Sequence, residues 1–434
     1  MKVGMISLGC SKNQVDSEMI LGLLKDNFTI TTKLEDADLL IINTCAFILS
    51  AKKEAIDEIL NTVYKRKRNQ RIVVCGCLAE RYTDELKKSI PEIDRIIPIK
   101  DYPRFASIIN ELFSIKEEPL CFTNRVLISH SSVPYVRIAD GCNNRCAFCA
   151  IPLIRGKYIS RTIEDIIDEV KYLVSLGAKE INLIAQDTSK YGIDLYHKLM
   201  LKDLLKEISK VDGVRLIRLF YIYPETISDE LIDEIKNNKK IAPYFDIPFQ
   251  HASNKILDSM NRHFSKEKSL ELINKIKREI PNAVIRTTLM VGFPGESEND
   301  FNELIEFVKE NRFFHMGAFT YSKEEDTKAF SMERQVHPKT KQRRYNTLMK
   351  VQEGIALELK RALVGNSYNA IVDDYDDDTF TYSLRSYHFA PDEVDGGIIA
   401  TCPFENNIKI GDIVKVKILD ATPYDLYGVI EDVE

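Results

Sequence analysis

Residues 140–149, DGCNNRCAFC, place three cysteines in a CxxxCxxC spacing. They follow an apolar run at residues 135–139 that predicts a strand. Three thiolates on one short loop can hold three corners of a cubane iron–sulfur cluster, whereas ordinary electron-transfer clusters use four cysteines. The fourth iron then keeps an open position for a substrate or cofactor. The predicted ligands are Cys142, Cys146 and Cys149.

A structural zinc site is the alternative for this loop, but zinc requires four ligands. No further cysteine follows before Cys402. The nearest other candidates, Cys121, His130 and His197, lie outside the spacing of a zinc finger. The ligand count therefore favours a cluster.

The bulk composition is that of a soluble globular protein. The chain has 434 residues, too many for one ordinary core, with 44% hydrophobic and 29% charged residues. No apolar run approaches the roughly 20 residues of a membrane helix, and polar residues follow the short apolar start at once. Nine cysteines are too few for a disulfide scaffold at this length. We expect a cytoplasmic protein that uses clustered cysteines as metal ligands.

The net charge of −6 is unevenly distributed. Residues 360–434 carry 6 basic and 15 acidic side chains, a balance of −9. The preceding residues therefore carry 54 basic and 51 acidic side chains, a balance of +3. Such an acidic C-terminal region is unsuited to binding a phosphate backbone.

Residues 1–115 alternate strand and helix, which predicts a parallel sheet covered by helices on both faces. The predicted strands are residues 2–8, 38–42 and 71–75. The predicted helices are residues 15–24, 49–66 and 80–89.

A cysteine follows each of these strands: Cys10, Cys45 and Cys77. Carboxyl ends of parallel strands share one edge where ligands bind, so we expect these thiols to converge on a second cluster with an open iron. Ordinary buried cysteines are the alternative, but the placement is repeated three times. Cys75 points to the same side of the pleat as Cys77 if the strand continues, so the residues alone leave it open as the third ligand. Cys77 is preferred because it lies in the loop.

Residues 116–134 have no clear hydrophobic periodicity and are interpreted as a linker, with Cys121 an ordinary thiol.

The central region, residues 130–357, again alternates strands and helices. Its predicted strands are residues 135–139, 180–185, 215–222, 244–247, 283–291 and 314–319. Its predicted helices are residues 163–176, 199–208, 231–235, 270–280 and 301–308. About six β/α units are too few for a closed eight-unit barrel, so we predict a partial (β/α)6 barrel whose open side can admit a macromolecule.

The carboxyl ends of these strands form the expected active face. Polar clusters follow there: the cysteine loop and residues 186–188, 250–251 and 292–296. Two glycines after a strand let the backbone approach a ligand, although many glycine turns merely close loops. We predict that Gln186, Gly292, Gly295 and Glu296 contact a cofactor. His251 is either catalytic or a structural hydrogen-bonding residue.

Residues 358–434 begin with a helical pattern that ends at Gly365. Five short β-like runs follow, at residues 368–372, 380–384, 397–401, 413–419 and 427–430. This pattern predicts a small antiparallel β-barrel of the oligonucleotide-binding type. The acidic run at residues 373–378 is interpreted as a solvated turn, and Cys402 as a bystander.

The CxxxCxxC loop, with the aromatic Phe148 before its last cysteine, resembles the radical S-adenosylmethionine superfamily. In that superfamily the open iron binds the amino and carboxylate groups of S-adenosylmethionine, and the resemblance implies that Phe148 lies against adenine. The order of the three regions resembles the methylthiotransferases over nearly the whole chain. It implies an N-terminal cluster domain (1–115), a radical core (130–357) and a TRAM barrel (358–434).

Several stretches resemble the branch that modifies a ribosomal protein: residues 8–18, 43–48, 185–188, 385–387 and 390–396. Residues 76–78, GCL, match the family's third N-terminal ligand and support Cys77 over Cys75. The resemblance implies two [4Fe-4S] clusters, S-adenosylmethionine, and an electron donor such as flavodoxin or ferredoxin. The implied substrate is an aspartate of the small-subunit ribosomal protein at the decoding centre, methylthiolated on its β-carbon.

The resemblance also implies the division of work between the two clusters. Reduction of the cluster on the central loop cleaves S-adenosylmethionine to methionine and a 5′-deoxyadenosyl radical, which attacks a C–H bond beyond the reach of a side-chain base. The N-terminal cluster holds the sulfur that a second S-adenosylmethionine methylates. The rival hypotheses are a tRNA adenosine methylthiotransferase and a non-enzymatic iron–sulfur assembly factor. The acidic C-terminal region disfavours direct RNA binding.

Overall fold

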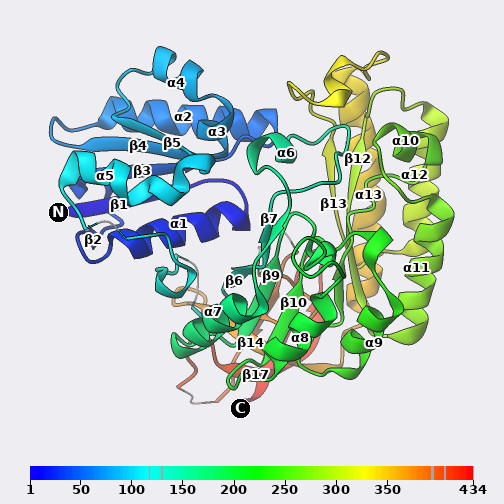
Figure 1. The fold of residues 1–434 in the computed structure, drawn as a ribbon. Coiled ribbons are helices and arrows are strands. Elements are labelled where there is room, and N and C mark those ends of the chain that lie inside the picture. Colours follow the sequence, from blue (N-terminus) through cyan, green and yellow to red (C-terminus); the bar gives the residue numbers. More distant parts are fainter. Residues whose placement is uncertain (117, 129–130, 392–394, 405–406, 434) are drawn as a thin grey trace.

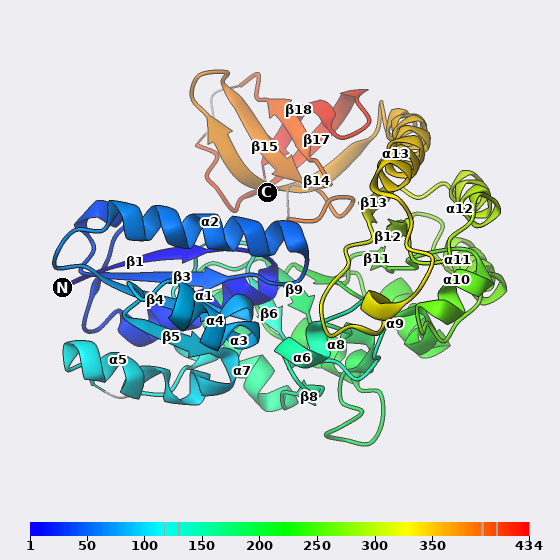
Figure 2. The same cartoon turned by 90° about the horizontal axis from the view of Figure 1, so that it is seen from above.

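The computed structural model describes residues 1–116, 118–128, 131–391, 395–404 and 407–433. Three parts follow one another along the chain: a parallel sheet with helices, a curved β/α sheet and a small barrel (Figure 1). Seen from above, the first two parts lie side by side, with the barrel at the top of the view (Figure 2). His130, and residues 392–394 of the stretch 390–396, lie outside the described residues. No helix of the described part is both long and apolar enough to cross a membrane.

The N-terminal sheet has five parallel strands, in the order β2 (Thr29–Ile30), β1 (Lys2–Ser7), β3 (Leu39–Thr44), β4 (Arg71–Gly76) and β5 (Arg95–Pro98). One face is covered by α1 (Ser11–Leu24) and α5 (Phe105–Phe113), the other by α2 (Leu49–Lys65), α3 (Cys77–Arg81) and α4 (Thr83–Ser89). Leu39 and Ile41 of β3 pack on the first face, and Leu40 and Ile42 on the second. Side chains alternate along a strand, so a sheet buried on both faces needs this unbroken apolar run.

The central strands are β6 (Tyr135–Arg137), β9 (Glu180–Ile184), β10 (Leu216–Leu219), β11 (Tyr244–Asp246), β12 (Val284–Val291) and β13 (His315–Thr320). They form two parallel sheets, β10-β9-β6 and β11-β12-β13. A parallel bridge between Ile217 and Ile241 joins the two. The result is a six-stranded curved sheet, and no pairing of β6 with β13 closes it within the described residues.

Helices cover the outside of this sheet: α7 (Ile163–Ser175), α8 (Leu201–Ser209), α9 (Asp229–Asn237), α10 (Asn254–Ser259), α11 (Lys266–Glu279), α12 (Glu298–Asn311) and α13 (Pro338–Arg361). Before α7, the hairpin β7 (Ala139–Asp140) and β8 (Ile159–Ser160) brackets the cysteine loop and α6 (Ile151–Ile154). Short 3₁₀ helices lie in connections: η1 (Leu34–Asp36), η2 (Ile99–Arg104), η3 (Phe122–Asn124), η4 (Thr188–Lys190), η5 (Pro224–Thr226) and η6 (Lys328–Ser331).

The C-terminal barrel is closed, in the order β14 (Ser367–Asp376), β15 (Thr381–Arg385), β16 (Ile398–Thr401), β18 (Leu426–Val433) and β17 (Ile413–Ala421). Its pairs are antiparallel except β16–β18, which is parallel. The sequence predicted an antiparallel barrel, but five strands in a ring cannot alternate direction all the way round. At least one parallel pair is therefore required by closure itself.

The barrel packs on the amino-terminal ends of the central strands. Arg385 Nη1 lies 2.7 Å from Oε2 of Glu180, the first residue of β9. Asp395 Oδ1 lies 3.0 Å from Arg286 Nε in β12. Glu180, Arg385 and Asp395 are buried and Arg286 is nearly so. The barrel therefore covers this end of the curved sheet and leaves the carboxyl end to face the N-terminal sheet.

Candidate functional site

One cavity lies between the N-terminal sheet and the carboxyl ends of the central strands. Its volume is about 440 Å³. Its walls include all six predicted cluster ligands: Cys10, Cys45, Cys77, Cys142, Cys146 and Cys149. The fold therefore brings both sets of cysteines, which are far apart in sequence, to the same space.

The N-terminal sheet assembles the first triad, Cys10, Cys45 and Cys77. Cys10 and Cys45 follow β1 and β3, and Cys77 begins α3 directly after β4. These three strands are neighbours, so their carboxyl ends lie at one edge of the sheet. Gly9 allows the loops to approach, because a Cβ at this position would lie 2.7 Å from the Cβ of Cys45. Its φ of +94° also suits glycine.

Asn13 fastens the loops of this triad to one another. Its Nδ2 donates to the carbonyl oxygens of Leu8 (3.0 Å) and Thr44 (2.9 Å). Its Oδ1 accepts from the Sγ of Cys77 at 3.4 Å. One buried amide thus contacts the connections that follow β1, β3 and β4.

The second triad lies on the loop between β7 and α6: Cys142, Cys146 and Cys149. Gly141 opens this loop with a φ of +73°, and a Cβ there would lie 2.0 Å from the carbonyl oxygen of Lys157. Only glycine fits such an approach. Arg262, which is buried, donates from Nη1 to the Sγ of Cys146 at 3.6 Å. A positive charge therefore lies against this triad.

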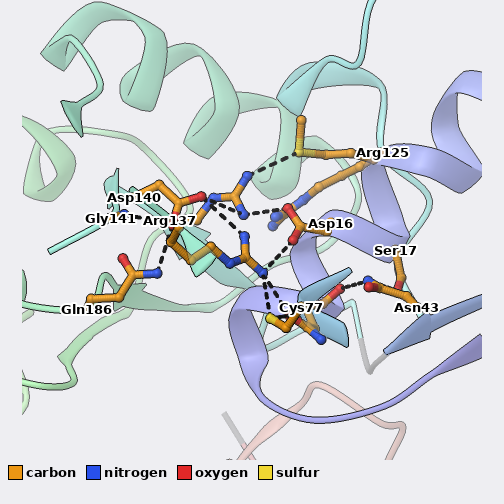
Figure 3. A network of polar contacts seen from close by, with 12 residues as sticks. Asp16, Ser17, Asn43, Cys77, Arg125, Arg137, Asp140, Gly141 and Gln186 are labelled. Atoms are coloured by element: carbon orange, nitrogen blue, oxygen red, sulfur yellow. Dashed lines mark hydrogen bonds and ion pairs between the residues drawn. The ribbon is translucent and has the colours of Figure 1, made fainter. Parts of the chain in front are cut away.

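A largely buried ion-pair network joins the two triads. Arg155 Nη2 lies 2.8 Å from Asp16 Oδ2 in α1, and its Nη1 lies 3.2 Å from Asp140 Oδ2, next to Gly141. Arg137 Nη1 lies 2.5 Å from the other oxygen of Asp16. Figure 3 shows Asp16, Arg137 and Asp140 converging beside Cys77. Buried charges are stable only when paired, so this network fixes the N-terminal sheet against the cysteine loop.

The pKa values in this network follow from the pairing. Burial opposes the charge of Arg155, but Asp16 and Asp140 outweigh burial and raise the pKa of Arg155 well above its ordinary value. Burial likewise opposes the charge of Asp140, but Arg155 and Arg137 lower its pKa below the ordinary range. Both groups therefore remain charged inside the protein.

The strong metal ligands in the cavity wall are all cysteine thiols, since no His, Asp or Glu lines it. Burial raises the pKa of Cys77 to about 12, of Cys142 to about 11 and of Cys149 to about 12. Metal binding displaces these protons and supplies the positive charge that buried thiolates require. Each set of three thiols has the number of protein ligands expected for a cubane cluster with one open iron. Among the described residues, no three His, Cys, Asp or Glu side chains are gathered closely enough to hold a single metal ion.

Two of the other predicted site residues also line the cavity, Phe148 and Gln186. Gln186 Nε2 donates to Asp140 Oδ1 at 2.7 Å, which ties the end of β9 to the start of the cysteine loop. The structure thus brings these two side chains to the cysteines. Their contact with a cofactor stays a prediction.

The turn at residues 292–296 is not among the residues that line the cavity. Glu296 Oε2 accepts from the backbone N–H groups of Gly292 (2.5 Å) and Phe293 (3.1 Å), and its Oε1 lies 2.8 Å from Arg344 Nη1. Glu296 therefore closes its own turn. The predicted cofactor contacts of Gly292, Gly295 and Glu296 stay predictions.

His251 does not line the cavity either. Its Nδ1 accepts from the backbone N–H of Ser253 at 3.0 Å, and burial lowers its pKa to about 3. A neutral, buried imidazole that accepts a local hydrogen bond fits the structural alternative for this residue.

The remaining cysteines lie outside the cavity. Cys75 packs into the core on the α1 side of the sheet, whereas Cys77 packs on the α3 side. The strand ends at Gly76, whose φ of +90° redirects the chain, so the shared pleat that the sequence left open does not form. Cys121 is exposed in the linker, and Cys402 lies at the edge of the barrel.

Sequence reasoning gave no individual role to several residues in or beside the cavity wall: Lys12, Asn13, Arg155, Arg262, Tyr221 and Tyr223. Of these, Lys12 and Asn13 lie in the stretch 8–18, which was quoted only for its family resemblance. Lys12 Nζ lies 3.2 Å from the centre of the Tyr221 ring, and burial lowers the pKa of this lysine to about 8. Tyr221 follows β10 with a φ of +55°, a strained conformation for a tyrosine. Its place after a strand of the active face was the only available signal.

Comparison with protein families gives three consecutive matches. Residues 2–98 match the uncharacterized protein family UPF0004, residues 136–308 the radical SAM superfamily, and residues 364–430 the TRAM domain. Together they span most of the chain, in the order that the sequence resemblance implied.

Curated relatives match over nearly the full length. The ribosomal protein uS12 methylthiotransferase RimO of Clostridium botulinum (strain Eklund 17B) is 45% identical over 443 residues, covering 99% of this chain and 98% of the relative. The protein of the same name from Caldicellulosiruptor saccharolyticus is 46% identical over 440 residues, covering 98% and 99%.

Solved structures share the fold at low identity. The radical S-adenosylmethionine methyltransferase TsrM from Kitasatospora setae has a TM-score of 0.54 at 13% identity, covering 74% of this chain and 75% of TsrM. The cobalamin-dependent radical enzyme OxsB has a TM-score of 0.52 at 11% identity, covering 82% and 56%. These likenesses concern the fold alone, whereas the curated relatives carry identity over their whole length. On that ground the chain belongs to the ribosomal protein uS12 methylthiotransferase RimO family.

Proposed function

We propose that this protein methylthiolates the β-carbon of an aspartate in ribosomal protein uS12, using S-adenosylmethionine and two [4Fe-4S] clusters. The observation that carries the proposal is that two separate cysteine triads line one cavity. A substrate carbon held there can meet both centres without leaving the protein. The near-full-length identity to RimO proteins supports the same activity.

In this proposal Cys142, Cys146 and Cys149 hold the cluster that binds S-adenosylmethionine, and Cys10, Cys45 and Cys77 hold the cluster that carries sulfur. When bound, these groups supply the radical, sulfur and methyl chemistry that side chains lack. The protein positions them: Asn13 and the Arg155 network set one triad against the other.

The cavity wall also protects reactive species. Many of its lining side chains are apolar: Phe47, Ile48, Ala51, Ile151, Ile154 and Phe319. Such a wall limits water near a carbon-centred radical and suppresses side reactions. Phe148 and Gln186, on the same wall, are our candidates for contacts with S-adenosylmethionine.

The proposal includes the partners of the reaction. uS12 is the substrate, and the acidic C-terminal region, with 15 acidic and 6 basic residues from 360 to 434, suits a basic ribosomal protein. A flavodoxin or ferredoxin supplies the electron, and the reaction takes place in the cytoplasm, with no membrane. Direct RNA binding is not favoured.

The test is anaerobic reconstitution followed by reaction with uS12, S-adenosylmethionine and a reductant. We expect about eight irons per chain. Mass spectrometry should show one methylthio group in place of one hydrogen on a uS12 aspartate. Modification of tRNA with uS12 unchanged would contradict the substrate. A reduced protein that forms no 5′-deoxyadenosine would contradict the enzymatic function itself.

A further inference from the structure

One cationic side chain in the cavity wall, Lys12, forms no direct ion pair among the described residues. Of the residues that line it, only Lys12 and Arg155 are cationic, and none is a carboxylate. Arg155 is paired with Asp16 and Asp140. Lys12 forms no ion pair or hydrogen bond with any residue that the structure describes; its contact is the ring of Tyr221 at 3.2 Å.

The surroundings of Lys12 are electrostatically unfavourable for a cation. The residue is 8% exposed, so its ammonium group is largely removed from water. It is the second residue of α1, whose N-terminus carries the positive end of the helix dipole. Cys10, Asp246 and Asp140 attract the ammonium group from a distance, and the guanidinium of Arg155 repels it. Because no carboxylate of the described residues lies within ion-pair distance, this buried cation can bind an anionic group supplied from outside the chain.

The thiols are the nearest alternative partners, and the geometry does not favour them. Cys10 exerts the largest electrostatic attraction on the Lys12 ammonium, but no hydrogen bond joins Lys12 Nζ to Cys10 Sγ among the described residues. Cys77 is already contacted by Arg155 Nη2 at 3.9 Å, and Cys146 by Arg262. Lys12 instead reaches across to Tyr221, which follows β10 in the opposite wall. Its charge therefore lies between the two triads.

We propose that Lys12 binds the side-chain carboxylate of the substrate aspartate and thereby positions the β-carbon between the triads. This inference rests on the proposed function. In aspartate the carboxylate is bonded directly to the β-carbon, so anchoring the carboxylate leaves that carbon little freedom. The same contact rejects uncharged substrates, because they leave the buried ammonium unpaired. Lys12 is thus a positioning and specificity residue for this reaction.

The test is a cycle of two enzymes and two substrates. Lys12→Met and wild type are each given uS12 and a uS12 variant whose target aspartate is asparagine. We expect wild type to prefer aspartate by about 100-fold in kcat/KM, and Lys12→Met to lose most of that preference. Lys12→Arg retains the charge and should keep the preference. Lys25→Met is the matched control, since Lys25 is exposed at the opposite end of α1.

Iron content and formation of 5′-deoxyadenosine without uS12 separate positioning from cluster assembly. The proposal requires both to stay at wild-type values in Lys12→Met. Loss of about four irons in that variant would show that Lys12 balances cluster charge, and would overturn the proposal. An undiminished preference for aspartate in Lys12→Met would overturn it equally. Failure of the proposed function is distinct: wild type would cleave S-adenosylmethionine yet leave uS12 unmodified.

Discussion

The two ends of the central strands have opposite characters. At the amino ends, Glu180 lies 2.7 Å from both Arg218 Nε and Arg385 Nη1, and all three side chains are buried. At the carboxyl ends, six cysteines and Lys12 face a cavity that holds no carboxylate. Charges that are satisfied within the chain stabilise the fold, whereas unsatisfied groups on a cavity wall are available to ligands. The same six strands therefore carry a structural end and a chemical end.

The largest expected effects come from the cavity. Cys142→Ala should abolish both 5′-deoxyadenosine formation and methylthiolation, because the cluster that binds S-adenosylmethionine loses one of its three ligands. Cys45→Ala should retain 5′-deoxyadenosine formation and lose only methylthiolation. Chromatography of the nucleoside and mass spectrometry of uS12 measure the two outcomes. Equal loss of both activities in the two variants would contradict the division of roles.

Cys75 and Cys77 offer a matched pair two residues apart. Cys77→Ala should lower the iron content after reconstitution from about eight to about four per chain. Cys75→Ala should leave it unchanged, because Cys75 is buried in the core on the α1 side. Iron and sulfide analysis of the two variants provides the comparison. Iron loss in Cys75→Ala but not in Cys77→Ala would show that Cys75, and not Cys77, is the cluster ligand.

The structural end should respond in stability. Glu180→Gln leaves two buried arginines without their shared carboxylate and should lower the free energy of unfolding by about 3 kcal/mol. Chemical denaturation of the protein without clusters measures this change. The control is Glu207→Gln, which breaks an exposed pair with Lys210 and should change stability by less than about 1 kcal/mol. A change of catalytic rate without a change of stability in Glu180→Gln would contradict the comparison.

The last effect concerns pH and develops only as the solution is made acidic. Burial lowers the pKa of His315, at the start of β13, to about 4, although the nearby Asp395 favours its charged form. The folded state therefore disfavours the proton relative to the unfolded state, whose histidine pKa is about 6.5. The resulting stabilisation is full above pH 6.5 and is lost as pH falls toward 4, on the order of 3 kcal/mol.

Denaturation between pH 7 and pH 4 measures this dependence on His315. His315→Gln should flatten the decline in stability over that range, whatever its stability at pH 7. His263→Gln, at an exposed position, should decline as wild type does. Parallel declines in all three proteins would show that His315 does not contribute.

Much of the fold follows from local patterns. The unbroken apolar run of β3 and the amphipathic spacing of α2 predict a covered parallel sheet without any knowledge of contacts. The short strands β2 and β5 escaped prediction because two to four residues carry too little periodicity. The predicted helix at residues 80–89 is two helices, α3 and α4, separated at Tyr82.

The sequence by itself determined the chemistry available to this protein: a CxxxCxxC loop, a cysteine after each of three strands, and an acidic C-terminal region. These are properties of spacing and composition, so they can be recognised in the sequence without a structure. Only the tertiary structure decided that both triads line one cavity, that Cys77 rather than Cys75 reaches it, and that Lys12 remains unpaired there. Those facts depend on how separate elements pack and on which buried charges find partners, and neither is encoded in a local pattern.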